Sequence, residues 1–390
     1  MQEDGTILYV IFLIFTGTAI LSTLALFTRQ SLLVAYMALG AILGPWGLKL
    51  IKSSALIKQT GDIGIIFLLF LLGLHLQPQN LLHSLRKMNW ITLTSSFIFL
   101  ALGFIVTKFF GYSYTQSLLV GITMMFSSTI ICLKLLPTTI LHHQHIGELM
   151  ISILLLQDII AIAALLVIQG IVDRFVSVKQ LILIALAFPT LLIVAYVFER
   201  YIVSHLLRLF DKVHEYIFIL SIGWCLCMAE LANVMGLSEE IGAFIAGVAF
   251  ASNPISLYIA ESLKPLRDFF LVMFFFTIGA GFNFDYLPQV AIPALVLGTL
   301  MLLVKPVVFS WLLQKSGESK KISWEVGVRL GQISEFSLLI VFLALQAKIV
   351  NPVTSYMVQA ATILTFVVSC YWVVLRYPTP LAATDKLRRD

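Results

Sequence analysis

Apolar segments of about 20 residues recur along the whole chain, and this pattern constrains the fold more strongly than any other feature of the sequence. A helix of that length crosses the hydrocarbon core of a bilayer. Of the 390 residues, 60% are hydrophobic and 12% are charged, whereas a soluble domain carries about 25% charged residues. The polar gaps between the apolar segments are short. The sequence therefore predicts an all-α polytopic membrane protein in which no soluble domain interrupts the helices.

The apolar segments divide into thirteen predicted transmembrane helices. The first follows the acidic stretch Met1–Asp4 and is too long for the apolar part of a secretory signal, so we expect it to be retained. The spans are expected at about residues 7–27, 31–49, 61–78, 90–111, 114–136, 148–172, 178–204, 215–234, 238–254, 266–284, 289–313, 322–347 and 352–375.

The distribution of basic residues predicts the orientation of the chain. With the N-terminus outside, 16 of the 25 Lys and Arg residues fall on the cytoplasmic side, seven on the outer side and two, Lys305 and Arg329, within spans. Because cytoplasmic loops carry the excess of basic residues, we expect a multi-pass protein of the cell inner (cytoplasmic) membrane with its N-terminus outside and its C-terminus in the cytoplasm. The net charge of +5 reflects this asymmetry and gives no indication of nucleic-acid binding.

The number of spans indicates an internal repeat. Thirteen spans divide into two sets of six joined by one linker helix, and an odd linker makes the second set run opposite to the first. This is the inverted-repeat plan of many secondary transporters. The four cysteines lie in or beside apolar segments and show no metal-binding spacing. We therefore expect two inverted six-helix repeats and a transporter rather than an enzyme, with no cofactor bound by this chain.

Polar residues interrupt the centres of the fifth and twelfth spans, which occupy matching positions in the two repeats. They are Ser127, Ser128 and Thr129 in the fifth span and Arg329, Gln332, Ser334 and Glu335 in the twelfth. Unwound backbone is tolerated at membrane depth where it lines a cavity or is covered by protein. We expect two discontinuous crossover helices. For the fifth span alone, hydroxyl groups bonded back to an unbroken helix are the alternative.

A carboxylate lies near the middle of the sixth span, in the apolar stretch Ile151–Ile168. A charged Asp158 at this depth costs at least about 2.5–3.5 kcal/mol, so we expect it to have a function. It can hold a proton or a dehydrated alkali cation but not both, and Gln157 offers a neutral oxygen beside it. We predict that these two residues bind a monovalent cation. The alternative is an Asp158 that a basic neighbour neutralises for packing alone.

Oxygen ligands for the same cation are available on the fifth span. The hydroxyl groups or unwound carbonyl groups of Ser127, Ser128 and Thr129 are of the kind that hard cations prefer. The predicted ion- and proton-binding set is therefore Asp158, Gln157, Ser127, Ser128 and Thr129.

Further ionisable residues are expected at membrane depth. With a rise of about 1.5 Å per residue, Asp158, Lys305 and Glu335 all lie within about 5 Å of the centres of their spans. Lys305 needs a partner there, and the options are Asp158, Glu335 or the carbonyl end of a broken half-helix; the alternative is a side chain that snorkels to the interface. We favour a crossover-stabilising role over direct ion binding for Arg329 and Glu335. The full predicted charge-balancing and crossover-stabilising set is Lys305, Glu335, Arg329, Gln332 and Ser334.

The whole chain resembles the monovalent cation:proton antiporters that include the Kef potassium-efflux systems. Each shared motif is short, and their order along the chain makes the resemblance specific. The motifs are Leu39–Leu48, which contains a Gly-Pro-x-Gly turn, and Asp62–Leu74, Phe126–Leu136, Gly242–Gly247, Leu266–Gly279 and Gly331–Phe336. The pair Gln157-Asp158 is similar to the Gln-Asp pair of the Kef branch, where other branches carry Asp-Asp or Asn-Asp.

The resemblance implies a dimerisation domain beside a six-helix core domain whose two crossed, broken helices frame the ion site. It also implies a homodimer in which the core alternates like an elevator against a fixed interface. The expected parts are two scaffold parts at 1–89 and 215–288, two core halves at 90–172 and 289–376, a linker helix at 173–214 and a cytoplasmic tail at 377–390. Kef systems continue into a cytoplasmic nucleotide-binding regulatory domain. Here such a domain is expected beyond residue 390 or on a separate chain, unless this is a short, ungated member.

The transported ions follow from the same resemblance. One titratable carboxylate in the Gln-Asp pair implies exchange of one cation for one proton, hence electroneutral transport, with K⁺ favoured over Na⁺. Lys305 matches a core lysine that in related antiporters can pair with the first Asp of the motif, and here Gln157 occupies that position. The alternatives are a Na⁺/H⁺ antiporter of the same fold, a gated passive potassium pathway without proton coupling, and a solute:cation symporter.

Overall fold

A computed structural model describes most of the chain at the level of individual residues. The described residues are 7–51, 63–64, 66–67, 69–71, 73–74, 78–136, 145–172, 178–210, 213–237, 239–251, 253 and 256–379. Parts of the predicted third span, of the linker 173–214 and of the tail 377–390 lie outside them.

The regular elements of the described residues are helices, as the sequence predicts. Before the linker they are α1 (Ile7–Phe27), α2 (Leu32–Leu43), α4 (Pro78–Phe109), α5 (Tyr114–Met124), α6 (Thr129–Lys134) and α8 (His145–Val172). The middle of the chain forms α9 (Val178–Phe198), a π-helical turn (Glu199–Val203), α10 (Ser204–Leu209), α11 (His214–Val234), α12 (Glu239–Ala251), α13 (Ser256–Ser262) and α14 (Lys264–Ala280). A 3₁₀ turn (Phe284–Tyr286) then leads into α15 (Leu287–Lys315), α16 (Lys320–Arg329), α17 (Glu335–Gln346) and α18 (Pro352–Arg376).

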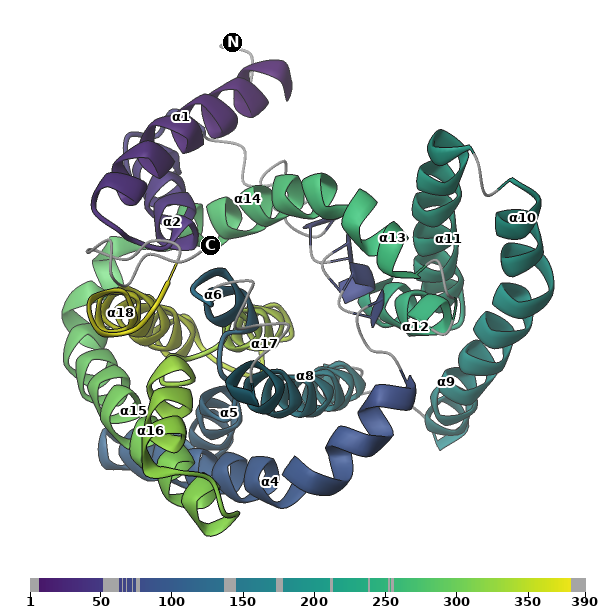
Figure 1. Ribbon diagram of the computed structural model, residues 1–390. Helices are drawn as coiled ribbons and strands as arrows, with labels where there is room; N and C mark the ends of the chain where they lie inside the picture. Colours follow the sequence, from purple (N-terminus) through teal and green to yellow (C-terminus); the bar gives the residue numbers. More distant parts are fainter. Residues whose placement is uncertain are drawn as a thin grey trace.

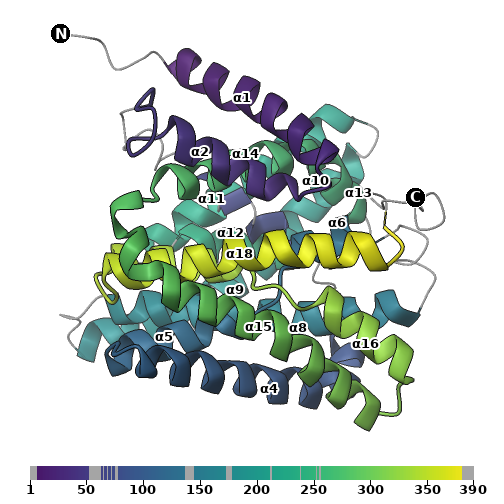
Figure 2. The same cartoon turned by 90° about the vertical axis from the view of Figure 1, so that its left-hand side faces the viewer.

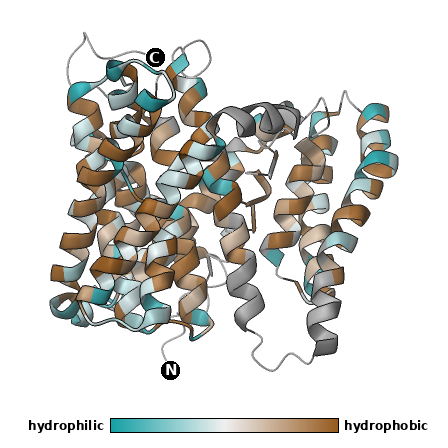
Figure 3. Ribbon diagram, turned by 90° about the horizontal axis from the view of Figure 1, so that it is seen from below, coloured by the Kyte–Doolittle hydropathy of each residue, from teal (hydrophilic) through white to brown (hydrophobic). Residues whose placement is uncertain are grey.

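The helices have the lengths and composition of membrane spans. Within the described residues, 8 helical segments are long and apolar enough to cross a bilayer, and four apolar helices of 10–17 residues accompany them. Large apolar side chains are exposed on the outside of the molecule, among them Phe27, Phe97 and Phe109, which are 83%, 71% and 86% exposed. Such exposure of large apolar groups is expected where a helix faces lipid. In Figure 3 the hydrophilic residues gather towards the two ends of the helices.

The predicted spans agree with the observed helices, with three kinds of difference. The span predicted at 31–49 corresponds to α2, which already ends at Leu43, because Gly44 caps the helix and Pro45 cannot continue it. The helix α4 begins at Pro78 although the predicted span begins at 90, because apolar character marks the part of a helix inside the membrane and says nothing of its polar extension. The span predicted at 266–284 corresponds to α14, which a separate short helix, α13, precedes. The described positions of the third span, between 63 and 74, are helical.

The helices fall into two groups that differ in position (Figure 1). The helices of residues 90–172 and 289–376 form one bundle, in which α17 packs against α5, α8 and α18. The remaining described helices, α1, α2 and α9 to α14, form an arc along one side of that bundle. Most closely packed pairs join helices of the same group, as in α2 with α14 and α11 with α12. We call these two groups the core bundle and the arc.

Small residues let two helices of the arc come into backbone contact. A Cβ atom on Gly40 of α2 would lie 2.1 Å from the carbonyl oxygen of Phe276 on α14, and one on Gly279 would lie 1.9 Å from that of Met37. Contacts this short leave no room for any side chain. Glycine at these positions therefore permits the close approach by which membrane helices commonly associate.

The first and last described helices show that the chain crosses the molecule an odd number of times. In Figure 2, α1 begins at one face of the molecule and α18 ends at the opposite face. An odd number of crossings agrees with the thirteen predicted spans. The assignment of these faces to the outside and the cytoplasm remains a prediction from the basic residues.

Candidate ion-binding site

Two helices of the core bundle are broken at their centres, as predicted. The helix α5 ends at Met124 and α6 begins at Thr129, whereas α16 ends at Arg329 and α17 begins at Glu335. Short polar side chains stabilise the new helix starts: Ser128 Oγ accepts the Ile131 N–H at 3.1 Å, and Ser334 Oγ accepts the Phe336 N–H at 3.1 Å. Both serines therefore act as caps, which explains why serine occupies the end of each unwound segment.

The two unwound segments bond directly to one another, so the broken helices cross at this point. Ser127 Oγ donates to the Leu330 carbonyl oxygen at 2.8 Å, and Gln332 Nε2 donates to the Ser128 carbonyl oxygen at 3.3 Å. The side chains of Ser127, Ser128 and Gln332 are almost completely buried. These bonds satisfy backbone groups that have no helical partner at membrane depth.

Lys305 of α15 joins the two breaks. Its Nζ donates to the carbonyl oxygens of Phe126 at 2.5 Å and Gln332 at 3.2 Å, and Ser127 Oγ lies 3.4 Å away. Three acceptors match the three donors of an ammonium group. Of the partners considered from the sequence, the structure therefore shows carbonyl groups of the broken helices. The side chain is fully buried, so it does not snorkel to the interface.

Gln157 of α8 holds the first break through both halves of its amide. Its Oε1 accepts the Ser127 N–H at 3.0 Å, and its Nε2 donates to the Met125 carbonyl oxygen at 3.1 Å. An aspartate at this position would have no donor for Met125. Gln157 thus fixes the backbone beside the site, and one lone pair of its oxygen remains available to a cation.

Asp158 lies one residue further along α8 and is 1% exposed. The hydroxyl of Thr129, the first residue of α6, lies 3.3 and 3.2 Å from its two carboxylate oxygens. No basic side chain of the described residues lies within ion-pair distance of Asp158. This observation argues against an Asp158 that a permanent basic neighbour neutralises.

Glu335 and Arg329 occupy the two helix ends on either side of the second break. Glu335 Oε1 accepts the Ile130 N–H at 3.2 Å, so its carboxylate lies against the start of α6. Arg329 is paired with Glu325 one turn earlier at 2.9 Å and donates to the carbonyl oxygens of Leu135 at 3.2 Å and Pro378 at 3.0 Å. Arg329 therefore ties the end of α16 to the ends of α6 and α18, in line with the structural role predicted for it.

The predicted site residues thus form one contiguous buried cluster, with two of them at its edge. Ser334 acts within its own helix as a cap, and Arg329 contacts Glu325 and neighbouring backbone groups rather than Asp158 or Glu335. The residues that the structure brings together are Ser127, Ser128, Thr129, Gln157, Asp158, Lys305, Gln332 and Glu335. Their roles in binding remain predictions.

The sequence profile of the family described as "Sodium/hydrogen exchanger, transmembrane" matches residues 11–375. The chain belongs to this exchanger family. The resemblance inferred from the motifs is thereby confirmed, and so is the expectation of a multi-pass membrane protein.

Individual relatives of the exchanger family are similar over most of the chain. "K(+) efflux antiporter 4" of Arabidopsis thaliana is 25% identical over 87% of this chain and 58% of the relative. "K(+) efflux antiporter 6" of the same plant is 28% identical over 80% and 53%. "Glutathione-regulated potassium-efflux system protein KefC" of Salmonella typhi is 27% identical over 96% and 62%. The chain therefore spans little more than half the length of these relatives.

A solved structure shares the fold. The sodium proton antiporter MjNhaP1 from Methanocaldococcus jannaschii superposes with a TM-score of 0.68, covering 93% of this chain and 95% of that chain at 17% identity. At this identity the match supports the exchanger fold alone.

Sequence reasoning missed several residues that support the cluster. Thr365 Oγ1 of α18 accepts the Ile333 N–H at 3.0 Å, and Ser369 Oγ donates to Gln332 Oε1 at 3.0 Å. Cys132 Sγ donates to the Arg329 carbonyl oxygen at 2.9 Å. The sequence of α18 did indicate a polar face towards the cluster, because hydroxyl residues such as Thr362, Thr365 and Ser369 recur three or four positions apart on one face of this apolar helix.

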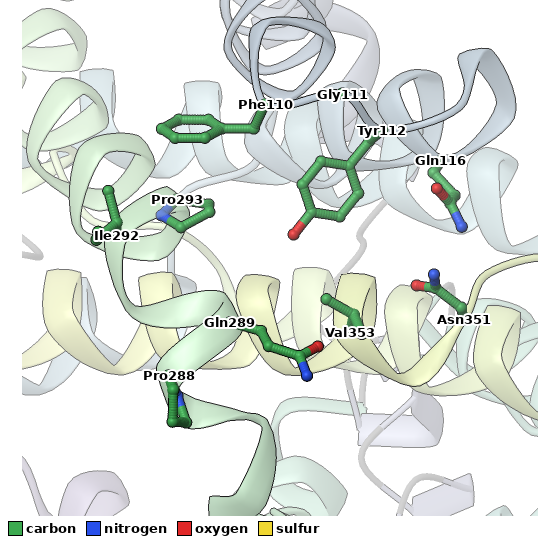
Figure 4. A pocket seen from close by; sticks show the side chains of 10 residues that line it. All are labelled: Phe110, Gly111, Tyr112, Gln116, Pro288, Gln289, Ile292, Pro293, Asn351 and Val353. Carbon is green, nitrogen blue, oxygen red and sulfur yellow. The ribbon is translucent and has the colours of Figure 1, made fainter.

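A pocket of about 470 Å³ lies apart from this cluster, where the ends of α4, α5, α15 and α18 meet (Figure 4). Its polar lining is uncharged and includes Tyr112, Gln116, Gln289 and Asn351. Burial raises the pKa of Tyr112, so its hydroxyl stays neutral at physiological pH. None of the predicted ion-site residues lines the pocket, and it offers no carboxylate to a cation.

Proposed function

We propose that this chain is a secondary active antiporter that exchanges a monovalent cation, with K⁺ favoured, for H⁺. The observation that carries the proposal is Asp158, a buried carboxylate beside the crossing of two broken helices, with no basic side chain of the described residues within ion-pair distance. A buried carboxylate in this position needs a proton or a cation. Two ions that compete for one group, loaded from opposite sides in turn, constitute exchange.

The family and its relatives support this function. Membership of the exchanger family is consistent with cation:proton exchange, and the potassium-efflux names of the plant and Salmonella relatives favour K⁺. The residue beside Asp158 supports a one-for-one stoichiometry. Because Gln157 has no titratable group, one cation is expected to replace one proton, and transport is expected to be electroneutral.

The arrangement of helices supports an elevator-like alternation. Both breaks and the helices α8 and α15 that bear Asp158 and Lys305 belong to the core bundle. The arc is internally close-packed through Gly40 and Gly279. The helices α2 and α18 pack against one another across the two groups, and apolar side chains of both groups meet in one continuous core. In the proposed mechanism the core bundle moves as a unit and carries Asp158 from one side to the other.

The proposed location is the cytoplasmic membrane. The excess of basic residues on one side supports an outer N-terminus and a cytoplasmic C-terminus in the cytoplasmic membrane. The resemblance to the Kef systems is the support for two further parts of the proposal, a homodimer through the arc and a nucleotide-binding regulatory domain, beyond residue 390 or on another chain. The chain is proposed to act as a transporter, without covalent catalysis or a resident cofactor.

Reconstitution with a panel of cations tests the function. Purified protein in liposomes with a trapped pH dye is given an outward proton gradient, and K⁺, Na⁺, Rb⁺ or Li⁺ is added outside. We expect K⁺ to drive the fastest proton efflux. A preference for Na⁺ would make the chain a sodium antiporter of the same fold. Potassium flux with no accompanying pH change would refute antiport and favour a passive pathway.

A further inference from the structure

Glu335 has a carboxylate oxygen for which the structure provides no partner. The side chain is 3% exposed. Its Oε1 accepts the Ile130 N–H, whereas its Oε2 has no hydrogen-bond partner within the part of the chain that the structure describes. A buried carboxylate oxygen left unpaired is costly, and a proton or a bound cation is the usual remedy. The free oxygen therefore indicates a group that is completed by an ion.

Asp158 is close to this carboxylate. Asp158 bonds to Thr129 and Glu335 bonds to Ile130, so the two acids reach consecutive residues of the same short helix. Two acids in contact with the same helix turn, brought together from α8 and α17, form a carboxylate pair at the crossing of the broken helices.

The buried bases of the region are engaged elsewhere. All three donors of Lys305 face oxygens of the two unwound segments, and Arg329 is paired with Glu325. The ion pair of Arg329 with Glu325 carries no net charge. The remaining described charges at the crossing are one positive charge on Lys305 and one negative charge on each of Asp158 and Glu335, so the ionised cluster carries one net negative charge.

We propose that Glu335 is the second carboxylate of the ion site: its free oxygen is a ligand for the transported cation, and its charge offsets that of Lys305. One monovalent cation or one proton then makes the cluster neutral, which is the favoured state in a dry interior. With Asp158 alone, Lys305 would already neutralise the site and a bound cation would leave a net positive charge. The inference rests on the proposed exchange function and preserves its one-for-one stoichiometry.

One pair of variants separates charge from shape at Glu335. Glu335→Gln keeps the volume and an acceptor for the Ile130 N–H but loses the charge, whereas Glu335→Asp keeps the charge in a shorter side chain. We expect the apparent KM for K⁺ to rise at least about tenfold in Glu335→Gln and to change much less in Glu335→Asp. A purely structural acceptor predicts the reverse order. Should Glu335→Gln fail to fold, Glu335→Asn replaces it as the uncharged counterpart of Glu335→Asp.

A second-site change supplies an independent readout. If charge balance is the cause, Lys305→Gln in the Glu335→Gln background restores the KM towards the wild-type value, because it removes the unbalanced positive charge. Ser113→Ala is the control, since it weakens the start of α5 away from the crossing and is expected to lower stability with little change in KM.

Two results would overturn the assignment: a Glu335→Gln KM within twofold of wild type, or no recovery in the double variant. Absence of K⁺-driven proton movement in the wild-type protein would instead refute the proposed function itself.

Discussion

Removing Glu325 is predicted to destabilise the protein strongly, although this residue lies outside the proposed ion site. The side chain of Arg329 is 1% exposed and that of Glu325 is 12% exposed, and the guanidinium donates to Glu325 Oε1 at 3.1 and 2.9 Å. Glu325→Ala leaves the arginine charge buried with two carbonyl groups and the Tyr377 ring, 5.4 Å from Cζ, as its remaining partners. Loss of one partner from a buried ion pair typically costs about 3–5 kcal/mol.

The expected change in melting temperature follows from the size of the chain. An unfolding entropy of about 2.1 cal/mol/K per residue over 390 residues converts this loss into a fall of about 4–6 °C. The measurement is the apparent melting temperature of the detergent-solubilised protein, followed by fluorescence-detected size exclusion. Glu325→Gln, which keeps an oxygen acceptor, is expected to lose less.

A matched surface pair provides the control. Glu148 pairs with His145 at 3.3 Å on α8, and its side chain is 72% exposed. Exposed pairs contribute about 0–1 kcal/mol, so Glu148→Ala is expected to shift the melting temperature by about 1 °C or less. Equal shifts for Glu325→Ala and Glu148→Ala would refute the claim that Arg329 depends on a buried partner.

Three further predictions follow from named contacts. Thr129→Val removes the hydroxyl that donates to Asp158 and is expected to change the apparent KM for K⁺ by at least about tenfold, since hydrogen bonds to charged groups contribute about 1.5–3 kcal/mol; Thr129→Ser should be close to wild type in the same transport assay. Gln157→Asp adds a second titratable group beside Asp158, so exchange should become sensitive to an imposed membrane potential, and unchanged insensitivity would count against the stoichiometric argument. Gly40→Val places a side chain against the Phe276 carbonyl, where even a Cβ atom would lie at 2.1 Å, and is expected to reduce the yield of folded protein measured by size exclusion, whereas wild-type yield would contradict the backbone contact.

Much of the architecture could be predicted because a bilayer restricts the chain to long apolar helices. The predicted first span coincides with α1, and the polar centres of the fifth and twelfth spans mark both breaks. The unwound segments were recognisable because Ser128 and Ser334 are poor residues for an apolar helix interior and good residues for a helix start.

The partners of the charged residues could not be predicted in the same way. The sequence left three possible partners for Lys305. Which of them it contacts depends on how α15 packs against the two helix breaks, and the spacing of residues along one helix does not determine that packing. The sequence shows how deep Glu335 lies in its span, but it does not show that Oε2 has no hydrogen-bond partner among the described residues. It therefore predicts a crossover-stabilising role for Glu335 and no more. Glu325 was a missed signal, since it lies four residues before Arg329 on one helical face.

The most direct test of the account is simultaneous recording of K⁺ flux and internal pH in liposomes that contain either the wild-type protein or Asp158→Asn. Wild type is predicted to move one proton against each K⁺, without generating a membrane potential, while Asp158→Asn moves neither ion although it folds and inserts normally. Exchange that persists in Asp158→Asn, or wild-type K⁺ flux that leaves the pH unchanged, would contradict the claim that one buried carboxylate alternates between the two ions.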